Sequence, residues 1–236
     1  MAEEDFDVDR LAAFLHLLPA QVSRLADRGK LPGRRVGGRW RFSAAEIHHW
    51  LEDRIGLSDE HELVEMEGVL QRAAPPGDEE PISICRMLRV EAIATPLAAR
   101  TRSSVIVEMT ELAAGTGLLW DPEKVADGVR AREAMQPTAL DIGVALLHPR
   151  RPMPGVLAEG LLALGITATG IPFGGSRGTL TDVFFLICSL NDQSHLRTLA
   201  RVSRMLSDTT TLSDLRAADS AQAAHTVITQ WEANLD

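Results

Sequence analysis

The sequence lacks tyrosine altogether, and aromatic residues make up only 4% of its 236 residues. It has two cysteines, Cys85 and Cys188, too few for a disulfide framework, as in proteins of the reducing cytoplasm. No apolar run approaches the roughly 18 residues that a membrane-spanning helix needs. The acidic start, MAEEDFD, lacks the basic residues that open a secretory signal. We therefore expect a globular, cytoplasmic protein with no membrane insertion.

Charge is distributed unevenly along the chain. The formal net charge of −9 argues against nucleic-acid binding by the whole surface, although a local basic patch remains compatible with it. Residues 24–41 contain one acid, Asp27, and seven bases. These bases are Arg24, Arg28, Lys30, Arg34, Arg35, Arg39 and Arg41. Residues 59–80 show the reverse, with eight acids against one base, Arg72.

The acidic stretch includes AAPPGDEEP, a composition typical of a solvated linker, preceded by helical periodicity in DEHELVEMEGVLQR. We therefore expect a small unit over residues 1–55, a partly helical acidic linker over 56–81, and a larger unit over 82–236.

The small unit has the pattern helix, turn, helix, basic hairpin, helix. Apolar residues recur at helical spacing in DVDRLAAFLHL, and Pro19 opens a second short helix that ends near Gly29. In RRVGGRWRF, two short β-prone runs flank Gly37-Gly38, a two-residue hairpin signal. Ser43 and Glu46 then form the sequence signature of a capping box before IHHWL.

This order, carried by PAQVSRLADRGKLPGRRVGGRWRF and IHHWL, resembles the excisionase/MerR-type winged helix-turn-helix. The resemblance implies binding to double-stranded DNA, with the second helix in the major groove and the hairpin along the phosphates. The implied DNA-binding residues are Gln21, Ser23, Arg24, Arg28, Arg34, Arg35, Arg39 and Arg41. We expect Trp40 to be a core residue beneath the hairpin. Two alternatives stay open: an ordinary solvated basic face, and a protein-docking module.

The larger unit alternates helical and strand patterns, which predicts the α/β class. Helices are expected over SSVIVEMTELAAGTGLL, DPEKVADGVRAREAM, SHLRTLARVSRMLSD, LSDLRAAD and AQAAHTVITQWEANL. Strands are expected over IGVALLH, GITATGIPF and TDVFFLICSL. The glycine-rich GIPFGGSRG lacks a nucleotide-binding arrangement and is expected to form the turn between two strands.

The segment LDIGVALLHPRR has a buried-strand pattern that ends on a histidine, a proline and two arginines. Together with REAMQPTA before it and HLRTLARVSRMLSD after it, this segment resembles the enzyme IIA domain of the bacterial phosphoenolpyruvate-dependent phosphotransferase system. The resemblance is to the fructose, mannitol and nitrogen-regulatory type, and it covers residues 82–230. It implies a mixed sheet flanked by helices.

The same resemblance implies a phosphotransfer site. His148 would accept the phosphoryl group, Arg132 would stabilise it, and His195 would be the second active-site histidine. Arg150, with its neighbour Arg151, would meet the phosphoryl group or an anionic donor surface. We expect His148 to be accessible to solvent at the rim of the sheet. The implied donor is the histidine phosphocarrier protein, with a downstream IIB-type or regulatory protein as a further partner, and no metal or other cofactor.

These observations predict a regulator in which phosphorylation of His148 is coupled to DNA binding. The alternative is a DNA-binding regulator whose IIA-like domain has lost phosphotransfer and serves dimerisation or docking. A small helix-turn-helix unit binds DNA weakly alone, so a homodimer is also considered. The sequence leaves the DNA target and the sugar or nitrogen signal open.

Overall fold

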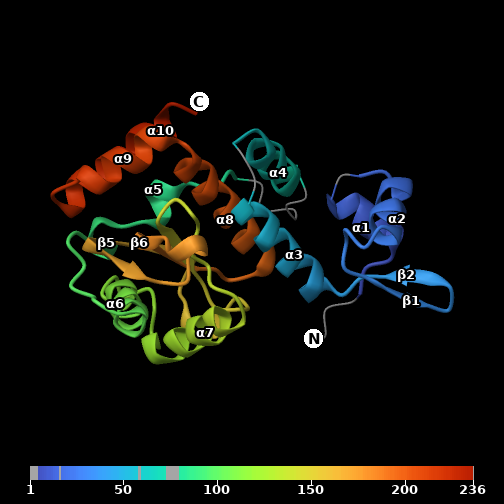
Figure 1. Ribbon diagram of the computed structural model, residues 1–236, viewed down its shortest axis with the longest axis horizontal. Coiled ribbons are helices and arrows are strands. Elements are labelled where there is room, and N and C mark those ends of the chain that lie inside the picture. The colour runs from blue at the N-terminus through green and yellow to red at the C-terminus, as the bar shows by residue number, and fades with distance from the viewer. Residues whose placement is uncertain (1–4, 16, 58–59, 73–79, 236) are drawn as a thin grey trace. The chain divides into compact units, whose positions relative to one another are not determined.

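The computed structural model describes residues 5–15, 17–57, 60–72 and 80–235. The chain folds into two compact units, Met1–Pro81 and Ile82–Asp236 (Figure 1). The acidic stretch contributes a helix to the first unit, whereas residues 73–79 of the expected linker lie outside the described residues. Within the described ranges, no helix is both long enough and apolar enough to cross a membrane.

The first unit has the expected order of elements. Helices α1 (Val8–Leu15) and α2 (Pro19–Asp27) are followed by the hairpin β1 (Arg34–Val36) and β2 (Arg39–Arg41), then by α3 (Ala44–Leu57) and α4 (Glu60–Arg72). The hairpin turn uses Gly37 and Gly38, both at positive φ, which a glycine adopts without strain. Phe42 is fully buried and packs so closely on Gly33 that a Cβ there would lie 2.7 Å from the Phe42 ring.

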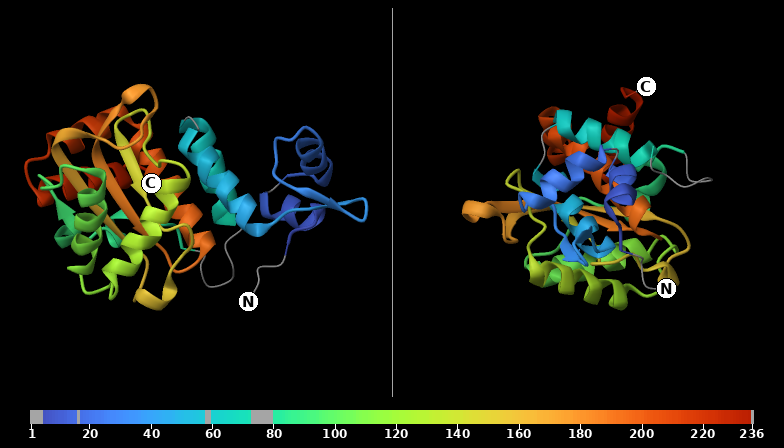
Figure 2. Two further views of the ribbon diagram at one scale, coloured as in Figure 1. Left: turned by 60° about the horizontal axis from the view of Figure 1, so that its bottom comes forward. Right: turned by 90° about the vertical axis from the view of Figure 1, so that its right-hand side faces the viewer.

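The second unit is built around a mixed four-stranded sheet in the order β3-β5-β6-β4. Its strands are β3 (Ile93–Ala94), β4 (Val144–Leu147), β5 (Leu161–Pro172) and β6 (Leu180–Cys188). β4 runs parallel to β6, β5 runs antiparallel to β6, and β3 runs parallel to β5 (Figure 2). The expected α/β class with a mixed sheet is confirmed. Sequence analysis missed β3 and the first four residues of β5.

Helices cover the sheet. The larger ones are α6 (Arg102–Ala114), α7 (Pro122–Met135), α8 (Asp192–Ser207), α9 (Thr209–Ala217) and α10 (Ala221–Ala233), with the short α5 at Ile84–Met87. Short 3-10 turns occur at Val90–Ala92, Pro154–Val156 and Ser176–Gly178. Figure 1 shows α6 and α7 on one side of the sheet and α9 and α10 on the other. The core lies between these layers, and every residue of β4 is buried.

Local caps define several of these helices. Asp121 accepts a hydrogen bond from the Lys124 amide at the start of α7, and Pro122 takes the first position of that helix. Asn191 does the same for α8 through the Ser194 amide. At the other end of the unit, the Glu232 carboxylate of α10 accepts hydrogen bonds from the amides of Ile84 and Cys85 and so holds α5.

Candidate functional site

The expected phosphotransfer residues converge at one edge of the sheet. Because β4 and β6 are parallel, their carboxyl ends lie at the same edge. His148 directly follows β4, and the chain enters α8 shortly after β6, with His195 in the first turn of that helix. The centroids of the His148 and His195 rings are 4.9 Å apart, with an angle of 48° between the ring planes. The structure therefore brings these two histidines together.

A backbone hydrogen bond fixes the tautomer of His148. Its Nδ1 lies 2.8 Å from the carbonyl oxygen of Leu146, two residues earlier. A carbonyl can only accept, so Nδ1 carries the proton and donates it. In the neutral ring the lone pair then belongs to Nε2. The end of β4 thus presents an imidazole whose nucleophilic nitrogen is defined by its own strand.

Arg132 reaches the same region through the segment between α7 and β4. This segment runs antiparallel to β4, with Ala139 paired to Ala145 and the Leu146 amide donating to the Thr138 carbonyl. Arg132 Nη1 donates to the Gln136 carbonyl at 2.9 Å. The expected arginine is therefore anchored at the start of the segment that pairs with β4.

Packing of α7 supports this placement. A Cβ on Gly128 would lie 3.0 Å from the Cβ of Pro149, so α7 passes close to the residue that follows His148. Gly128 and Arg132 are four residues apart and share one face of the helix. The face that carries Arg132 is thus the face that contacts the segment after His148.

Glu133 is a buried residue at this site that the functional assignment did not include. Its carboxylate accepts hydrogen bonds from the Thr138 amide at 3.1 Å and from the Thr138 hydroxyl, and it pairs with Arg102 at 2.7 Å. The Arg102 guanidinium also lies over the Phe173 ring, 5.3 Å from its centroid. Glu133 therefore ties α6, α7 and the segment beside β4 together.

The adjacent Arg132-Glu133 pair gave a signal for Glu133 in the sequence, because both residues belong to the matched motif. Arg102, the partner of Glu133, lies at the start of a helix far upstream, and the sequence gave no signal for it.

The expectation of a solvent-accessible imidazole is wrong for this structure. His148 is 2% exposed, His195 5% and Arg132 4%. The strand ends close to the expected residue, but Pro149 is buried as well, and Arg150 and Arg151 after it are exposed.

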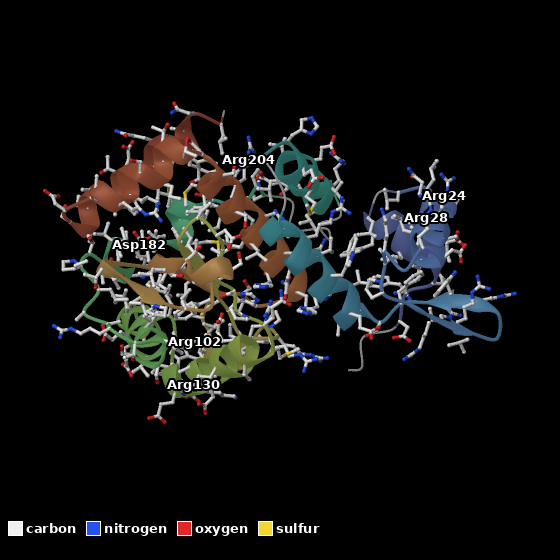
Figure 3. The ribbon with its side chains drawn as sticks, viewed as in Figure 1. Arg24, Arg28, Arg102, Arg130, Asp182 and Arg204 are labelled. Carbon is white, nitrogen blue, oxygen red and sulfur yellow. The ribbon has the colours of Figure 1, made fainter. Side chains whose placement is uncertain are left out.

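The expected DNA-contacting residues of α2 fall into two groups. Gln21, Arg24 and Arg28 are exposed and follow an i, i+3, i+7 spacing, which places them on one helix face. Figure 3 shows Arg24 and Arg28 projecting from α2. Ser23 is half-buried and does not share this face. The Gln21 side-chain oxygen accepts a hydrogen bond from the Leu18 amide at 2.8 Å, so this residue also caps the helix.

The hairpin arginines Arg34, Arg35 and Arg39 are exposed, and Arg41 is half-buried. The expectation that Trp40 is a core residue is wrong, because Trp40 is half-buried and Phe42 fills the core in its place. The Trp40 indole stacks on Phe42, lies under the Arg35 guanidinium and donates its Nε1 hydrogen to Asp27. It joins the hairpin to the end of α2.

Comparison with known proteins finds one matching family for each of the two units. The family described as "Phosphoenolpyruvate-dependent sugar phosphotransferase system, EIIA 2" matches residues 86–231, and a helix-turn-helix domain family matches residues 6–55. The nitrogen regulatory proteins of Shigella flexneri and Escherichia coli (strain K12) are each 29% identical over 161 residues, which is 66% of this chain and 94% of theirs.

Solved structures show the same fold for the second unit. Nitrogen regulatory protein IIA-Ntr from Neisseria meningitidis matches with a TM-score of 0.54 and 20% identity, over 61% of this chain and 98% of that one. IIA mannitol from Escherichia coli matches with a TM-score of 0.53 and 18% identity, over 59% and 97% respectively. The chain therefore belongs to the EIIA 2 family of the phosphoenolpyruvate-dependent sugar phosphotransferase system and also carries an N-terminal helix-turn-helix domain.

Proposed function

We propose that the protein is a regulatory phosphocarrier in which Nε2 of His148 accepts a phosphoryl group from the phosphorylated histidine phosphocarrier protein. The observation that carries this proposal is the paired arrangement of His148 and His195 at the end of β4, with Nδ1 of His148 held by the Leu146 carbonyl. The nitrogen regulatory relatives support a regulatory role rather than transport.

In the proposed step, the Nε2 lone pair attacks the phosphorus of the donor phosphohistidine. A new P–N bond forms to His148 while the donor P–N bond breaks, and the donor imidazole keeps that electron pair. The His148 ring gains positive charge as the bond forms. The Nδ1–H that donates to the Leu146 carbonyl then becomes a stronger donor, which stabilises this charge.

The surrounding groups are suited to the incoming anion. The guanidinium of Arg132 offers forked donors to phosphoryl oxygens, and the amino end of α8 contributes the positive end of a helix dipole. His195 lies in the first turn of that helix and offers a further ring N–H. Arg150 is exposed after the strand and is proposed to meet the donor surface.

The test is incubation of the full chain with phosphoenolpyruvate, the general phosphotransfer enzyme and the phosphocarrier, followed by intact-mass measurement at alkaline pH. The expected result is one acid-labile phosphoryl group on the wild type and on His225→Ala, and none on His148→Ala. His225 is a matched control because it lies in α10, away from the β4 edge. A phosphoryl group that persists in His148→Ala, or a wild type that gains none, contradicts the proposal.

In a second candidate function, the IIA-like unit has lost phosphotransfer and serves as a docking or dimerisation module. The two candidates make opposite predictions for His148→Ala. Regulation that survives this substitution unchanged supports the docking module, whereas its loss together with the phosphoryl group supports the phosphocarrier.

We further propose that the first unit binds double-stranded DNA and that phosphorylation changes this binding. The exposed face of α2 and the arginine-rich hairpin support the DNA contact. A phosphoryl group would add about −1.5 to −2 charges to the chain. The measurement is DNA affinity of the full chain before and after phosphorylation at fixed salt. Equal affinities reject the coupling, and an affinity that does not depend on salt rejects DNA binding in favour of protein docking.

A further inference from the structure

The N-terminal residues lie against the base of the β1–β2 hairpin. Phe6 forms a two-way antiparallel bridge with Phe42, its amide donating to the Phe42 carbonyl at 2.8 Å and its carbonyl accepting from the Phe42 amide at 2.9 Å. The Phe6 ring also stacks on Phe14 with 5.2 Å between centroids. In an extended segment the residues on either side of Phe6 point to the face opposite its own side chain. The bridge therefore directs Asp5 and Asp7 to one side.

On that side the two aspartates meet two arginines of the hairpin. Asp5 lies 2.7 Å from Arg34 Nη2, and Asp7 lies 3.8 Å from Arg41 Nη1. Arg34 and Arg41 face each other directly across the hairpin register. Like charges at such a position repel, so the two carboxylates relieve a repulsion that the sequence builds into the hairpin.

A third carboxylate pairs with an arginine in the middle of the hairpin. Asp27, the last residue of α2, accepts from Arg35 Nη2 at 2.9 Å and from the Trp40 indole at 3.1 Å. Three of the seven bases are thus paired. Among the described residues, the other four form no ion pair. These are Arg24, Arg28, Lys30 and Arg39.

We propose that Asp5 and Asp7 are internal competitors of the DNA phosphates for Arg34 and Arg41. This inference rests on the proposed DNA binding of the first unit. In the free protein the carboxylates occupy these guanidinium groups, and binding exchanges them for phosphate oxygens. The four bases without carboxylate partners bind phosphates without this exchange and dominate the affinity. The acidic N-terminal segment therefore lowers the affinity of the hairpin for DNA.

The first test compares Asp5→Asn with Asp9→Asn in the full chain, using a random-sequence duplex at fixed salt. Both variants remove one negative charge, but Asp9 is exposed on α1 and has no ion pair within the described residues. Breaking an exposed ion pair predicts that Asp5→Asn binds about 1.4- to 5-fold tighter than the wild type. We expect a smaller gain for Asp9→Asn, because its charge acts only over a screened distance.

The second test uses the arginines and does not depend on the Asp5 variant. We expect Arg39→Ala to lower the slope of log affinity against log salt by about 0.9, the contribution of one phosphate contact. Arg34→Ala should change both affinity and slope less, because its contact is offset by the lost pair with Asp5. In an Asp5→Asn background, Arg34→Ala should lower the DNA affinity as much as Arg39→Ala does.

The outcomes separate this inference from the proposed function. A wild type that binds DNA in a salt-dependent way, with Asp5→Asn no tighter than Asp9→Asn, overturns the competition and leaves DNA binding standing. The competition is also overturned if Arg34→Ala lowers the DNA affinity as much as Arg39→Ala in the wild-type background. A wild type that shows no salt-dependent binding overturns both.

Discussion

Substituting Glu133 by glutamine should weaken the second unit at the point where the candidate site is assembled. The side chain of Glu133 is 2% exposed, whereas that of its partner Arg102 is 39% exposed. The carboxylate accepts from the Thr138 amide and hydroxyl and from Arg102. A glutamine has one acceptor oxygen, and its NH2 group must face a donor on one side or the other.

The expected loss of unfolding free energy follows from the difference in exposure between Glu133 and Arg102. Arg102 can be hydrated after the pair is lost, so the effect should be smaller than the 3–5 kcal/mol typical of breaking a fully buried pair. The glutamine keeps one acceptor oxygen, which reduces the destabilisation further. We therefore expect Glu133→Gln to lose about 2–4 kcal/mol of unfolding free energy. For a chain of this size that corresponds to a fall in Tm of about 4–16 °C.

Urea and thermal unfolding of the full chain, followed by circular dichroism and tryptophan fluorescence, measure this loss. Glu111→Gln is the matched control, because Glu111 is exposed on α6 and should change stability by less than about 0.5 kcal/mol. Since Glu133 holds the segment that carries Gln136, phosphorylation of the folded variant should also be slower than in Glu111→Gln. A Glu133→Gln protein as stable as the control would refute the reasoning.

Two further predictions concern stability. Burial alone would raise the pKa of Glu232, but hydrogen bonds from Ser83–Cys85 lower it below its ordinary value. This carboxylate therefore stabilises the fold above the ordinary glutamate pKa of roughly 4.3, and the contribution is lost as pH falls through the lowered pKa. Urea unfolding from pH 7 downward should show a loss that Glu232→Gln lacks. Gly165→Ala should destabilise by about 1–3 kcal/mol in equilibrium unfolding, because its Cβ would lie 2.6 Å from Met109 Sδ and 2.8 Å from Leu97. An unchanged midpoint would show that these side chains move aside freely.

Several features of the fold were predictable because their causes are local. The Gly37-Gly38 pair determines a turn within a few residues, so the sequence identified this turn directly. Periodicity likewise identified the longer helices, although it missed the four-residue helix α5. It missed β3, because Ile93–Ala94 is too short to show alternation and is a strand only through pairing with β5.

The candidate phosphotransfer residues were predicted from a family resemblance, and their proximity was not visible in their spacing. His148 and His195 meet because β4 and β6 are parallel and end at one edge of the sheet. The burial of His148 could not be read from the strand pattern. A polar residue at a strand end is compatible with exposure or burial, and only the packing around it decides between them.

The sequence by itself determined the α/β class and the concentration of seven bases in residues 24–41, because local propensity and composition are properties of neighbouring residues. Only the tertiary structure decided which bases are neutralised. Asp5 reaches Arg34 through the Phe6–Phe42 bridge, a contact between residues far apart in the chain. Ion pairs depend on distances of a few ångströms, and a count of charges along a sequence contains no such distances.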